Sequence, residues 1–264
     1  MHKTSLHLAG AVLALASFST PVAAAPSARA ANPSAKLTKM PKVIFFDVNE
    51  TLLDLSAMRA SVGEALGGRE DLLPLWFSTM LHHSLVDSTT KRFHTFGEVG
   101  VAALLMVAKV QGIELSPEAA KASIVTPLRS LPPHPDVIPG LKAPKKMSPK
   151  LVSLTNSSNL GVKTQFENAK LIEYFDGRLS VEDIETYKPD LSTYRWAAKK
   201  MGVAIEDTML VAAHGWDIAG AKAAGMQAVF IRRPGKVLYP LAIPPDLEVD
   251  GLDGLVKALE ATAR

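Results

Sequence analysis

The chain of 264 residues contains no cysteine, which excludes disulfide bonds, thiol catalysis and thiolate metal sites together. Aromatic residues make up only 6% of it, and no basic stripe with interleaved aromatics occurs, so nucleic-acid binding is not expected. Blocks of one charge are missing too, because acidic and basic residues are scattered and the net charge is only +3. The hydrophobic share of 47% is enough for one sizeable core, or a core with a smaller module.

No apolar run of 18 or more residues occurs. The run near the N-terminus, Leu6 to Phe18, has 13 residues and is too short to span a membrane. A basic head with Lys3 precedes it and the small residues of PVAAAPSARA follow it, which is typical of a secretory signal peptide. We therefore expect residues 1–30 to be a signal and processing region, cleaved after Ala25 or Ala30, and the mature protein to be periplasmic or secreted without membrane contact. An uncleaved anchor, or a true start at Met40, is the alternative.

Beyond a small and polar linker at 31–41, Lys42 to Phe46 is predicted to be a fully buried strand, because it is short, β-branched and aromatic without polar alternation. Gly202 and Gly225 stand where helix C-caps are expected. Buried strands alternating with helices predict an α/β fold with a Rossmann-like parallel sheet. The other predicted strands are 151–154, 209–212 and 228–231, and the predicted helices are 161–170, 192–201 and 218–224.

One segment interrupts this alternation, because residues 56 to about 131 contain helical patterns only. The segment ends in LPPHPDVIPG, residues 131–140, a proline-rich connector that we expect not to be helical. We predict an inserted helical cap domain at 56–135 and a core assembled from 42–55 and 136–264.

Four polar groups follow the predicted strands in order. They are Asp47 with Thr51, then Thr155 with Asn156, then Lys188 and finally Asp217. Residues just past the carboxyl ends of parallel strands line the ligand crevice. Four in succession predict a catalytic site, although each has a plainer explanation: Asp47 and Asp217 as helix caps, Thr155 and Asn156 as turn residues, and Lys188 as a solvated loop lysine.

This order of motifs resembles the haloacid dehalogenase superfamily. Within it, FFDVNETLLDL, YKPDLSTY and VAAHGWDIAGAKAAG are most similar to the type II, or L-2-haloacid, dehalogenases. The resemblance extends from about residue 42 to residue 233. It implies a hydrolase that converts short 2-haloacids to 2-hydroxy acids, with a preference for the L enantiomer, no cofactor, and a possible homodimer.

Chemistry supports the narrower family, because the phosphatases of the superfamily need an acid two residues after the nucleophile to protonate the leaving alcohol. That position is Asn49 here, and Ala213 occupies the place of a metal-binding aspartate. A halide leaves without a proton and needs no magnesium, so we expect no metal site.

The resemblance implies that Asp47 attacks the halogen-bearing carbon and forms an aspartyl ester, which water then hydrolyses. Lys188 would hold Asp47 ionised, supported by Thr51 and Asp217. The substrate would be contacted by Thr155, Asn156, Asn49 and Tyr194, although Tyr194 is equally compatible with the core.

Two departures from the family are visible. Phe77 stands where many relatives have a cap arginine that binds halide, so Arg59 or Arg92 is a candidate replacement, while Leu81 and Phe96 occupy pocket positions. His214 replaces an asparagine, and we hypothesise that its neutral imidazole deprotonates the hydrolytic water. A metal-dependent phosphatase, a non-catalytic binding protein and a dehalogenase for fluoroacetate or a bulkier haloacid stay open as alternatives.

Overall fold

The computed structural model describes Leu37 and residues 39–263, so the predicted signal peptide and most of the predicted linker lie outside the described part of the chain. No helix in this described part is long and apolar enough to cross a membrane.

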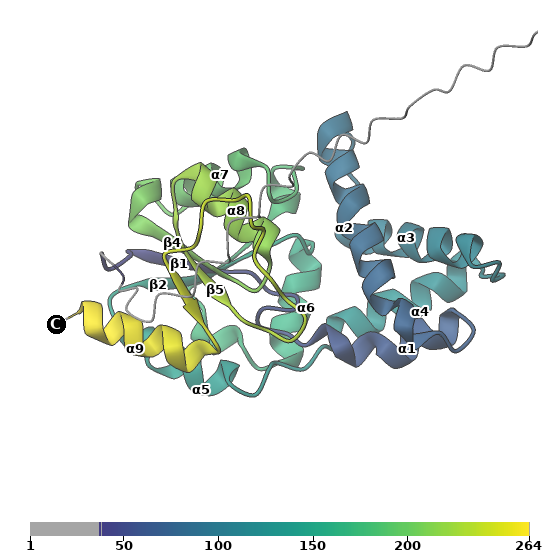
Figure 1. Cartoon of the computed structure of the whole chain (residues 1–264), viewed down its shortest axis with the longest axis horizontal. Coiled ribbons are helices and arrows are strands. Elements are labelled where there is room, and N and C mark those ends of the chain that lie inside the picture. The colour runs from purple at the N-terminus through teal and green to yellow at the C-terminus, as the bar shows by residue number, and fades with distance from the viewer. Residues whose placement is uncertain (1–36, 38, 264) are drawn as a thin grey trace, which may run out of the picture. The chain divides into compact units, whose positions relative to one another are not determined.

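Within the described residues, six strands form one parallel sheet in the order β3-β2-β1-β4-β5-β6, which confirms the predicted α/β class (Figure 1). The register pairs Phe46 of β1 with Ser153 of β2 and with Val211 of β4, so the carboxyl ends of these central strands lie side by side. The strands are β1 (Val43–Phe46), β2 (Lys150–Thr155), β3 (Gly177–Ser180), β4 (Thr208–Ala212), β5 (Gln227–Ile231) and β6 (Leu247–Val249).

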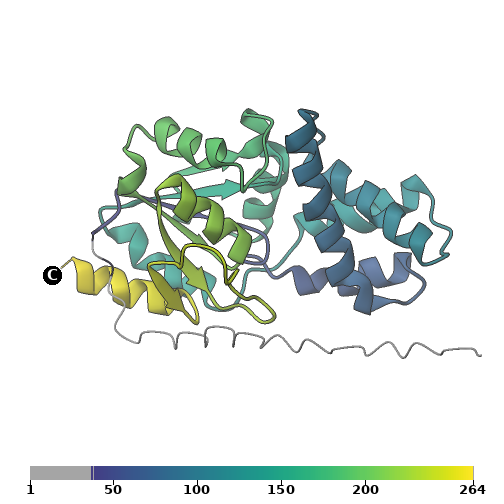
Figure 2. The ribbon, with the colours of Figure 1, turned by 45° about the horizontal axis from the view of Figure 1, so that its top comes forward.

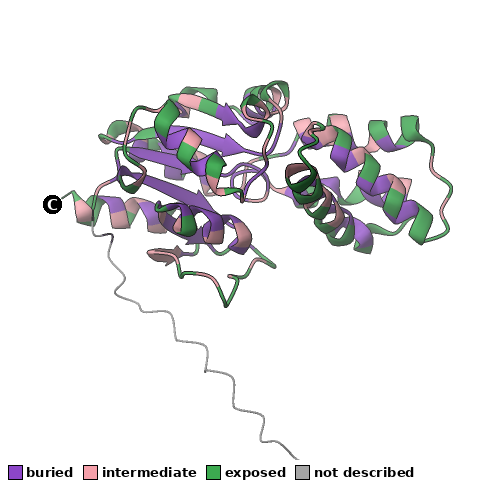
Figure 3. Cartoon of the chain, turned by 90° about the horizontal axis from the view of Figure 1, so that it is seen from above, coloured by how far each residue is buried: buried purple, intermediate pink, exposed green. Residues whose placement is uncertain are grey.

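Helices cover both faces of this sheet, because successive residues of a strand point to opposite sides. Ile44 and Phe46 of β1 belong to the cluster of buried residues on the face of α5, α6 and α9. Val43 and Phe45 belong to the other cluster, with α7 and α8. The strands are accordingly buried between two helical layers (Figure 3). The helices are α5 (Val137–Lys142), α6 (Asn159–Asn168), α7 (Leu191–Lys200), α8 (Gly215–Ala224) and α9 (Leu252–Thr262).

Between β1 and β2 the chain is helical, as expected, and these helices gather beside the sheet (Figure 2). Thr95 starts α3 with a capping box to Glu98. The indole Nε1–H of Trp76 donates to the carbonyl oxygen of Gly100 at 2.8 Å, which ties α2 to α3. These helices are α1 (Arg59–Ala65), α2 (Leu73–Thr90), α3 (Phe96–Val110) and α4 (Pro117–Arg129).

The structure differs from the sequence-based expectation in two places. The connector 131–140 is partly helical, because α5 begins at Val137. Pro139 is tolerated there since N–H groups in the first turn have no partner within the helix. Strands β3 and β6 were not predicted, because each lies at an edge of the sheet and lacks a continuous apolar run. Gly202 and Gly225 have φ angles of 70° and 104°, which confirms their predicted place at helix ends.

Candidate active site

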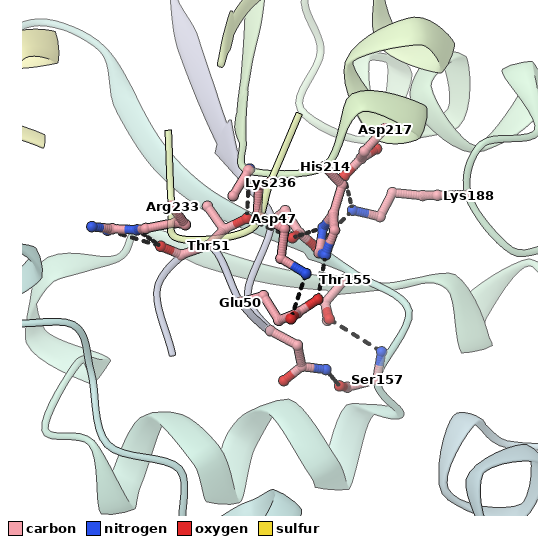
Figure 4. Close-up of polar contacts among 12 residues, drawn as sticks. Asp47, Glu50, Thr51, Thr155, Ser157, Lys188, His214, Asp217, Arg233 and Lys236 are labelled. Carbon is pink, nitrogen blue, oxygen red and sulfur yellow. Dashed lines mark hydrogen bonds and ion pairs between the residues drawn. The ribbon is translucent and has the colours of Figure 1, made fainter. Parts of the chain in front are cut away.

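Asp47 lies directly after β1 and is almost fully buried. Its Oδ1 accepts a hydrogen bond from Lys188 Nζ at 3.0 Å, and its Oδ2 accepts one from Thr51 Oγ1 at 2.7 Å (Figure 4). Thr51 is fixed in turn, because the backbone N–H of Ala213 donates to its Oγ1 at 2.9 Å. The end of β1 and the loop after β4 are therefore joined through one threonine hydroxyl.

Lys188 is buried between two carboxylates. Its Nζ also donates to Oδ2 of Asp217 at 2.5 Å. Burial would lower the pKa of Lys188, but the charges of Asp217 and Asp47 outweigh it and raise that pKa. For Asp47, burial would raise the pKa, and the charge of Lys188 together with hydrogen bonds from His214 and Thr51 holds it well below its usual range. The nucleophile predicted from the sequence is therefore ionised and oriented.

Tyr194 lies behind this group instead of facing a cavity. It is fully buried on α7, and its hydroxyl donates to Oδ1 of Asp217 at 2.6 Å. Gly220 of α8 leaves the space for it, since a Cβ there would be 2.5 Å from the tyrosine oxygen. Tyr194 therefore orients Asp217, and the predicted direct contact with substrate does not fit its position.

Thr155 is the last residue of β2, one residue beyond the predicted strand, and Asn156 follows it. The backbone N–H of Ser157 donates to Thr155 Oγ1 at 3.1 Å, and that of Lys188 donates to Asn156 Oδ1 at 3.1 Å. The Nδ2 group of Asn156 is buried and has no protein partner among the described residues. A buried donor without an acceptor is costly, so this amide suits an anionic ligand.

Asn49, at the position of the missing acid, is engaged inside the protein. Its Nδ2 donates to Ser157 Oγ at 3.1 Å, and its Oδ1 accepts from Gln165 Nε2 at 2.8 Å. Both ends of the amide contact protein groups, so Asn49 fixes the loop after β2, and its contact with substrate stays a prediction.

His214 connects two carboxylates. Its Nδ1 lies 3.1 Å from Asp47 Oδ2, and its Nε2 lies 2.8 Å from Glu50 Oε2. Burial would lower the pKa of the imidazole, but these two hydrogen bonds and charges outweigh it and raise the pKa to about 9. The ring is therefore an imidazolium at neutral pH, and the prediction of a neutral base in the resting protein is wrong.

Sequence reasoning missed Glu50 and Lys236. Glu50 Oε1 lies 2.5 Å from Lys236 Nζ, so the chain of contacts runs from Asp47 through His214 and Glu50 to Lys236 (Figure 4). Lys236 lies in the loop after β5, at the same edge of the sheet. The expectation that residues beyond the carboxyl end of a strand line the ligand crevice would have found it, if it had been applied to β5. Glu50 has a φ of 63°, which is uncommon for a residue other than glycine and has no signature in a single sequence.

The predicted pocket residues divide between two cavities. Phe77 and Leu81 of α2 line a cavity of about 710 Å³ with His214, Trp216 and Lys236. Phe96 lies at a separate cavity of about 420 Å³ with Ser157 and Gln165, because it starts α3 and packs on Tyr187. The structure therefore places Phe96 at a different cavity from Phe77 and Leu81. Asp47 lines neither cavity directly.

Phe77, at the place of the expected arginine, stacks on the ring of His214 with centroids 6.2 Å apart, and Trp216 stacks on the same ring at 5.0 Å. An arginine at 77 would lie beside the imidazolium and near Lys236, whose Nζ is 6.0 Å from the Phe77 ring. Like charges this close repel, which accounts for an aromatic residue here. Of the two candidate arginines, Arg59 lines the larger cavity and Arg92 does not.

A magnesium ion, which phosphatases of this type use, does not fit these residues. Hard divalent cations need carboxylate oxygens that are free to bind them. Here both oxygens of Asp47 and both oxygens of Asp217 already accept hydrogen bonds. His214 adds a positive charge at Asp47 Oδ2. No group of three or more potential ligands of the His, Cys, Asp or Glu type occurs within the described range.

Comparison with known proteins identifies the family of the chain. A family model described as haloacid dehalogenase-like hydrolase matches residues 41–225. The (S)-2-haloacid dehalogenase of Pseudomonas sp. (strain YL) is 29% identical over 84% of this chain and 96% of its own length. Haloacetate dehalogenase H-2 of Moraxella sp. (strain B) is 27% identical over 81% of this chain and 96% of its own.

A solved structure is similar in fold. The L-2-haloacid dehalogenase from Xanthobacter autotrophicus with chloropropionic acid covalently bound has a TM-score of 0.78 to this chain. It is 22% identical, and the match covers 84% of this chain and 99% of that one.

Proposed function

Because the chain belongs to the haloacid dehalogenase-like hydrolases, we propose that it hydrolyses the carbon–halogen bond of short 2-haloacids, releasing halide and a 2-hydroxy acid. The names of its relatives, (S)-2-haloacid dehalogenase and haloacetate dehalogenase, support this substrate class and the S, or L, enantiomer.

The observation that carries the proposal is the environment of Asp47. Lys188, Thr51 and His214 keep its carboxylate ionised and fix its orientation in a buried site. At the acid position, Asn49 has both polar ends paired and has no proton to give a leaving group. Such a site suits a leaving group that departs as a stable anion, which is the case for a halide.

In the first step, Asp47 attacks the halogen-bearing carbon in line, and the carbon–halogen electron pair leaves with the halide. Oδ1 is the attacking atom, because it has one protein donor, Lys188, whereas Oδ2 has two, Thr51 and His214. The product is an aspartyl ester with inverted configuration at the substrate carbon.

In the second step, water adds to Cγ of Asp47, and its proton passes to Asp217, the carboxylate that shares the Lys188 ammonium. Collapse of the tetrahedral intermediate breaks the bond between Cγ and Oδ1, so Oδ1 leaves with the substrate carbon as the alkoxide of the 2-hydroxy acid. The oxygen of the water stays on Cγ and restores the carboxyl group of Asp47. The ester alkoxide takes a proton from the carboxyl group formed, and Asp217 releases its own to solvent.

The substrate carboxylate is proposed to bind at the end of β2, where Asn156 Nδ2 has no partner in the described part of the chain and Thr155 Oγ1 keeps its own proton to donate. The larger cavity supplies positive charge for attracting the anionic substrate and the departing halide through Arg59 and Lys236.

Export is a separate proposal, supported by Lys3 and the apolar run Leu6 to Phe18. Cleavage after Ala25 or Ala30 would be tested by determining the N-terminus of the protein recovered from the periplasm of a producing bacterium. Recovery of the intact N-terminus in the cytoplasm would contradict it.

Halide release from the purified protein tests the reaction. The protein would receive L- and D-2-chloropropionate separately in EDTA, beside Asp47→Asn, and a phosphate ester with magnesium would be assayed in parallel. We expect halide from the L form only, and none from the variant.

The alternatives give different results. Phosphate released only with magnesium would indicate a phosphatase of the same superfamily. Binding of chloropropionate without turnover would indicate a non-catalytic binding protein, and halide from fluoroacetate or bulkier haloacids alone would indicate a shifted substrate range.

A further inference from the structure

Four charged groups are in direct contact, and of these only Asp47 takes part in the bond changes of the two reaction steps above. They are Asp47, His214, Glu50 and Lys236, joined at 3.1, 2.8 and 2.5 Å. Glu50 reaches His214 from a backbone with a φ of 63°, a conformation that costs free energy for any residue with a Cβ. Strain of this kind persists where the surroundings hold it in place, as these ion pairs do.

The two oxygens of Asp47 differ in a way that matters once the ester has formed. Oδ1 becomes the ester oxygen that carries the substrate carbon, so Oδ2 becomes the carbonyl oxygen. Thr51 Oγ1 and His214 Nδ1 both lie at this Oδ2, at 2.7 and 3.1 Å. When water adds to Cγ, the carbonyl electron pair moves onto Oδ2, and negative charge develops between these two donors.

We propose that His214 and Thr51 form the oxyanion hole for hydrolysis of the aspartyl ester, and that Glu50 is a positioning residue that keeps His214 charged after Asp47 has lost its own charge. The inference rests on the proposed dehalogenase reaction. It gives His214 the role of a charged hydrogen-bond donor in place of a base.

The need for Glu50 follows from the charges that face the imidazole. In the resting protein two carboxylates, Asp47 and Glu50, stabilise the imidazolium. Esterification removes the first of them, while burial and the nearby Lys188 and Lys236 still favour the neutral ring. Of the two carboxylates that contact the ring among the described residues, Glu50 is the one that then keeps its charge and holds the proton. The rings of Phe77 and Trp216 keep the imidazole in place.

Two matched substitutions separate charge from packing. Glu50→Gln keeps an acceptor for His214 Nε2 and removes the negative charge. Lys236→Gln removes the positive charge that pairs with Glu50, so that this carboxylate pairs with His214 alone. The first should lower the pKa of His214 and the second should raise it. Glu50→Gly is the control for misfolding, because glycine adopts a φ of 63° without strain while the carboxylate is removed.

Rapid-quench kinetics with L-2-chloropropionate would follow halide and hydroxy acid separately, and the mass of the intact protein would report the ester. In His214→Ala, ester hydrolysis should slow by about 100-fold or more, as for loss of one oxyanion donor, and by a larger factor than the first burst of halide. The ester should accumulate in this variant.

The pH dependence has a definite sign. An imidazolium donor supports ester hydrolysis at low pH and stops supporting it as pH rises through the pKa of the ring, whereas a base would behave in the opposite way. We expect the alkaline limb of hydrolysis to move to lower pH in Glu50→Gln and to higher pH in Lys236→Gln.

Asp47→Asn imitates the uncharged ester and gives a measurement without turnover. The ring titration of His214, followed by NMR, should stay above neutrality in Asp47→Asn and fall below it in the double variant with Glu50→Gln.

Equal slowing of halide release and hydrolysis in both His214→Ala and Glu50→Gln, or an alkaline limb of hydrolysis that does not move in Glu50→Gln, would overturn the inference alone. A ring pKa that does not respond to Glu50→Gln in the Asp47→Asn background would do the same. Absence of any halide from the wild-type protein would overturn the proposed function and this inference with it.

Discussion

Among single residues, Lys188 is the one whose loss should disturb the site most, because its ammonium lies between two buried carboxylates. Lys188→Met would leave Asp47 and Asp217 facing each other without compensation. Removing one partner of a buried ion pair costs about 3–5 kcal/mol. We expect a loss of that size in the free energy of unfolding at neutral pH, together with loss of halide release.

Urea denaturation of the wild type and Lys188→Met would measure this difference. The deficit should narrow under mild acid, where the two uncompensated carboxylates take up protons, and it should be smaller in the double variant with Asp217→Asn. An unchanged unfolding midpoint would show that the ion pair contributes little.

His214 gives a stability prediction of the opposite pH sign. Its pKa is raised from 6.5 to about 9, so its contacts with Asp47 and Glu50 stabilise the folded protein fully below the lower value. This contribution is lost as pH rises through about 9. The difference in unfolding free energy between wild type and His214→Gln should therefore be largest in weak acid and shrink on the alkaline side. A difference that grows with pH would contradict the imidazolium assignment.

At the scale of helices and strands, the contact between α7 and α8 sets the position of Asp217. A Cβ at Gly220 would lie 2.5 Å from the oxygen of Tyr194 and 2.7 Å from Cβ of Pro189, the residue after Lys188. Overpacking of this kind costs about 1–3 kcal/mol. We expect Gly220→Ala to lower the melting temperature and, by displacing Tyr194 and Lys188, to lower kcat more than it changes KM.

Gly97 on α3 is the matched control, because a Cβ there would meet nothing within 4 Å. Alanine at this position should leave kcat unchanged and should stabilise the helix by up to about 1 kcal/mol. Equal loss of activity in both variants would show that Gly220 is not specific to the site.

The strands that were predicted from the sequence and those that were missed differ in how far they are buried. β1 and β4 were found because every residue in them is buried, which leaves a continuous apolar run. β3, with Gly177 and Arg178, has no such run, because it lies at an edge and needs burial over only part of its length. The start of α5 at Val137 was missed because the prolines of residues 131–140 were taken to exclude a helix. Pro139 lies in the first turn of α5, where a proline is tolerated.

For the site, position beyond a predicted strand indicated Asp47, Asn156 and Asp217, whereas Lys188 follows β3, which was not predicted, and was indicated by its motif YKPDLSTY. It was not enough to give the charge of His214, which depends on a glutamate and an aspartate that the fold brings to its two ring nitrogens. The division of Phe77 and Phe96 between two cavities likewise depends on how α2 and α3 are packed, which residue spacing does not contain.

At the scale of the whole molecule, the inserted helices and the sheet domain are tied together at Tyr187. Its hydroxyl donates to the carbonyl oxygen of His94 at 2.5 Å, and its backbone N–H donates to Ser88 Oγ at 2.9 Å. We expect Tyr187→Phe to change the unfolding free energy by about 1 kcal/mol. Amide hydrogen exchange in residues 91–95 should become faster, and KM should rise because the helices close less firmly over the site. Ser192→Ala, on the exposed start of α7, is the control and should leave exchange in 91–95 unchanged.

The stacking of Trp216 on His214 has an optical consequence. An indole next to a protonated imidazole loses fluorescence, because the excited ring passes an electron to the cation more readily than to the neutral form. With Trp76 and Trp196 replaced by phenylalanine, the remaining emission would come from Trp216, at 5.0 Å from the imidazole. The fluorescence intensity of Trp216 would then rise when His214 loses its proton, so intrinsic emission would report the charge of the site in real time.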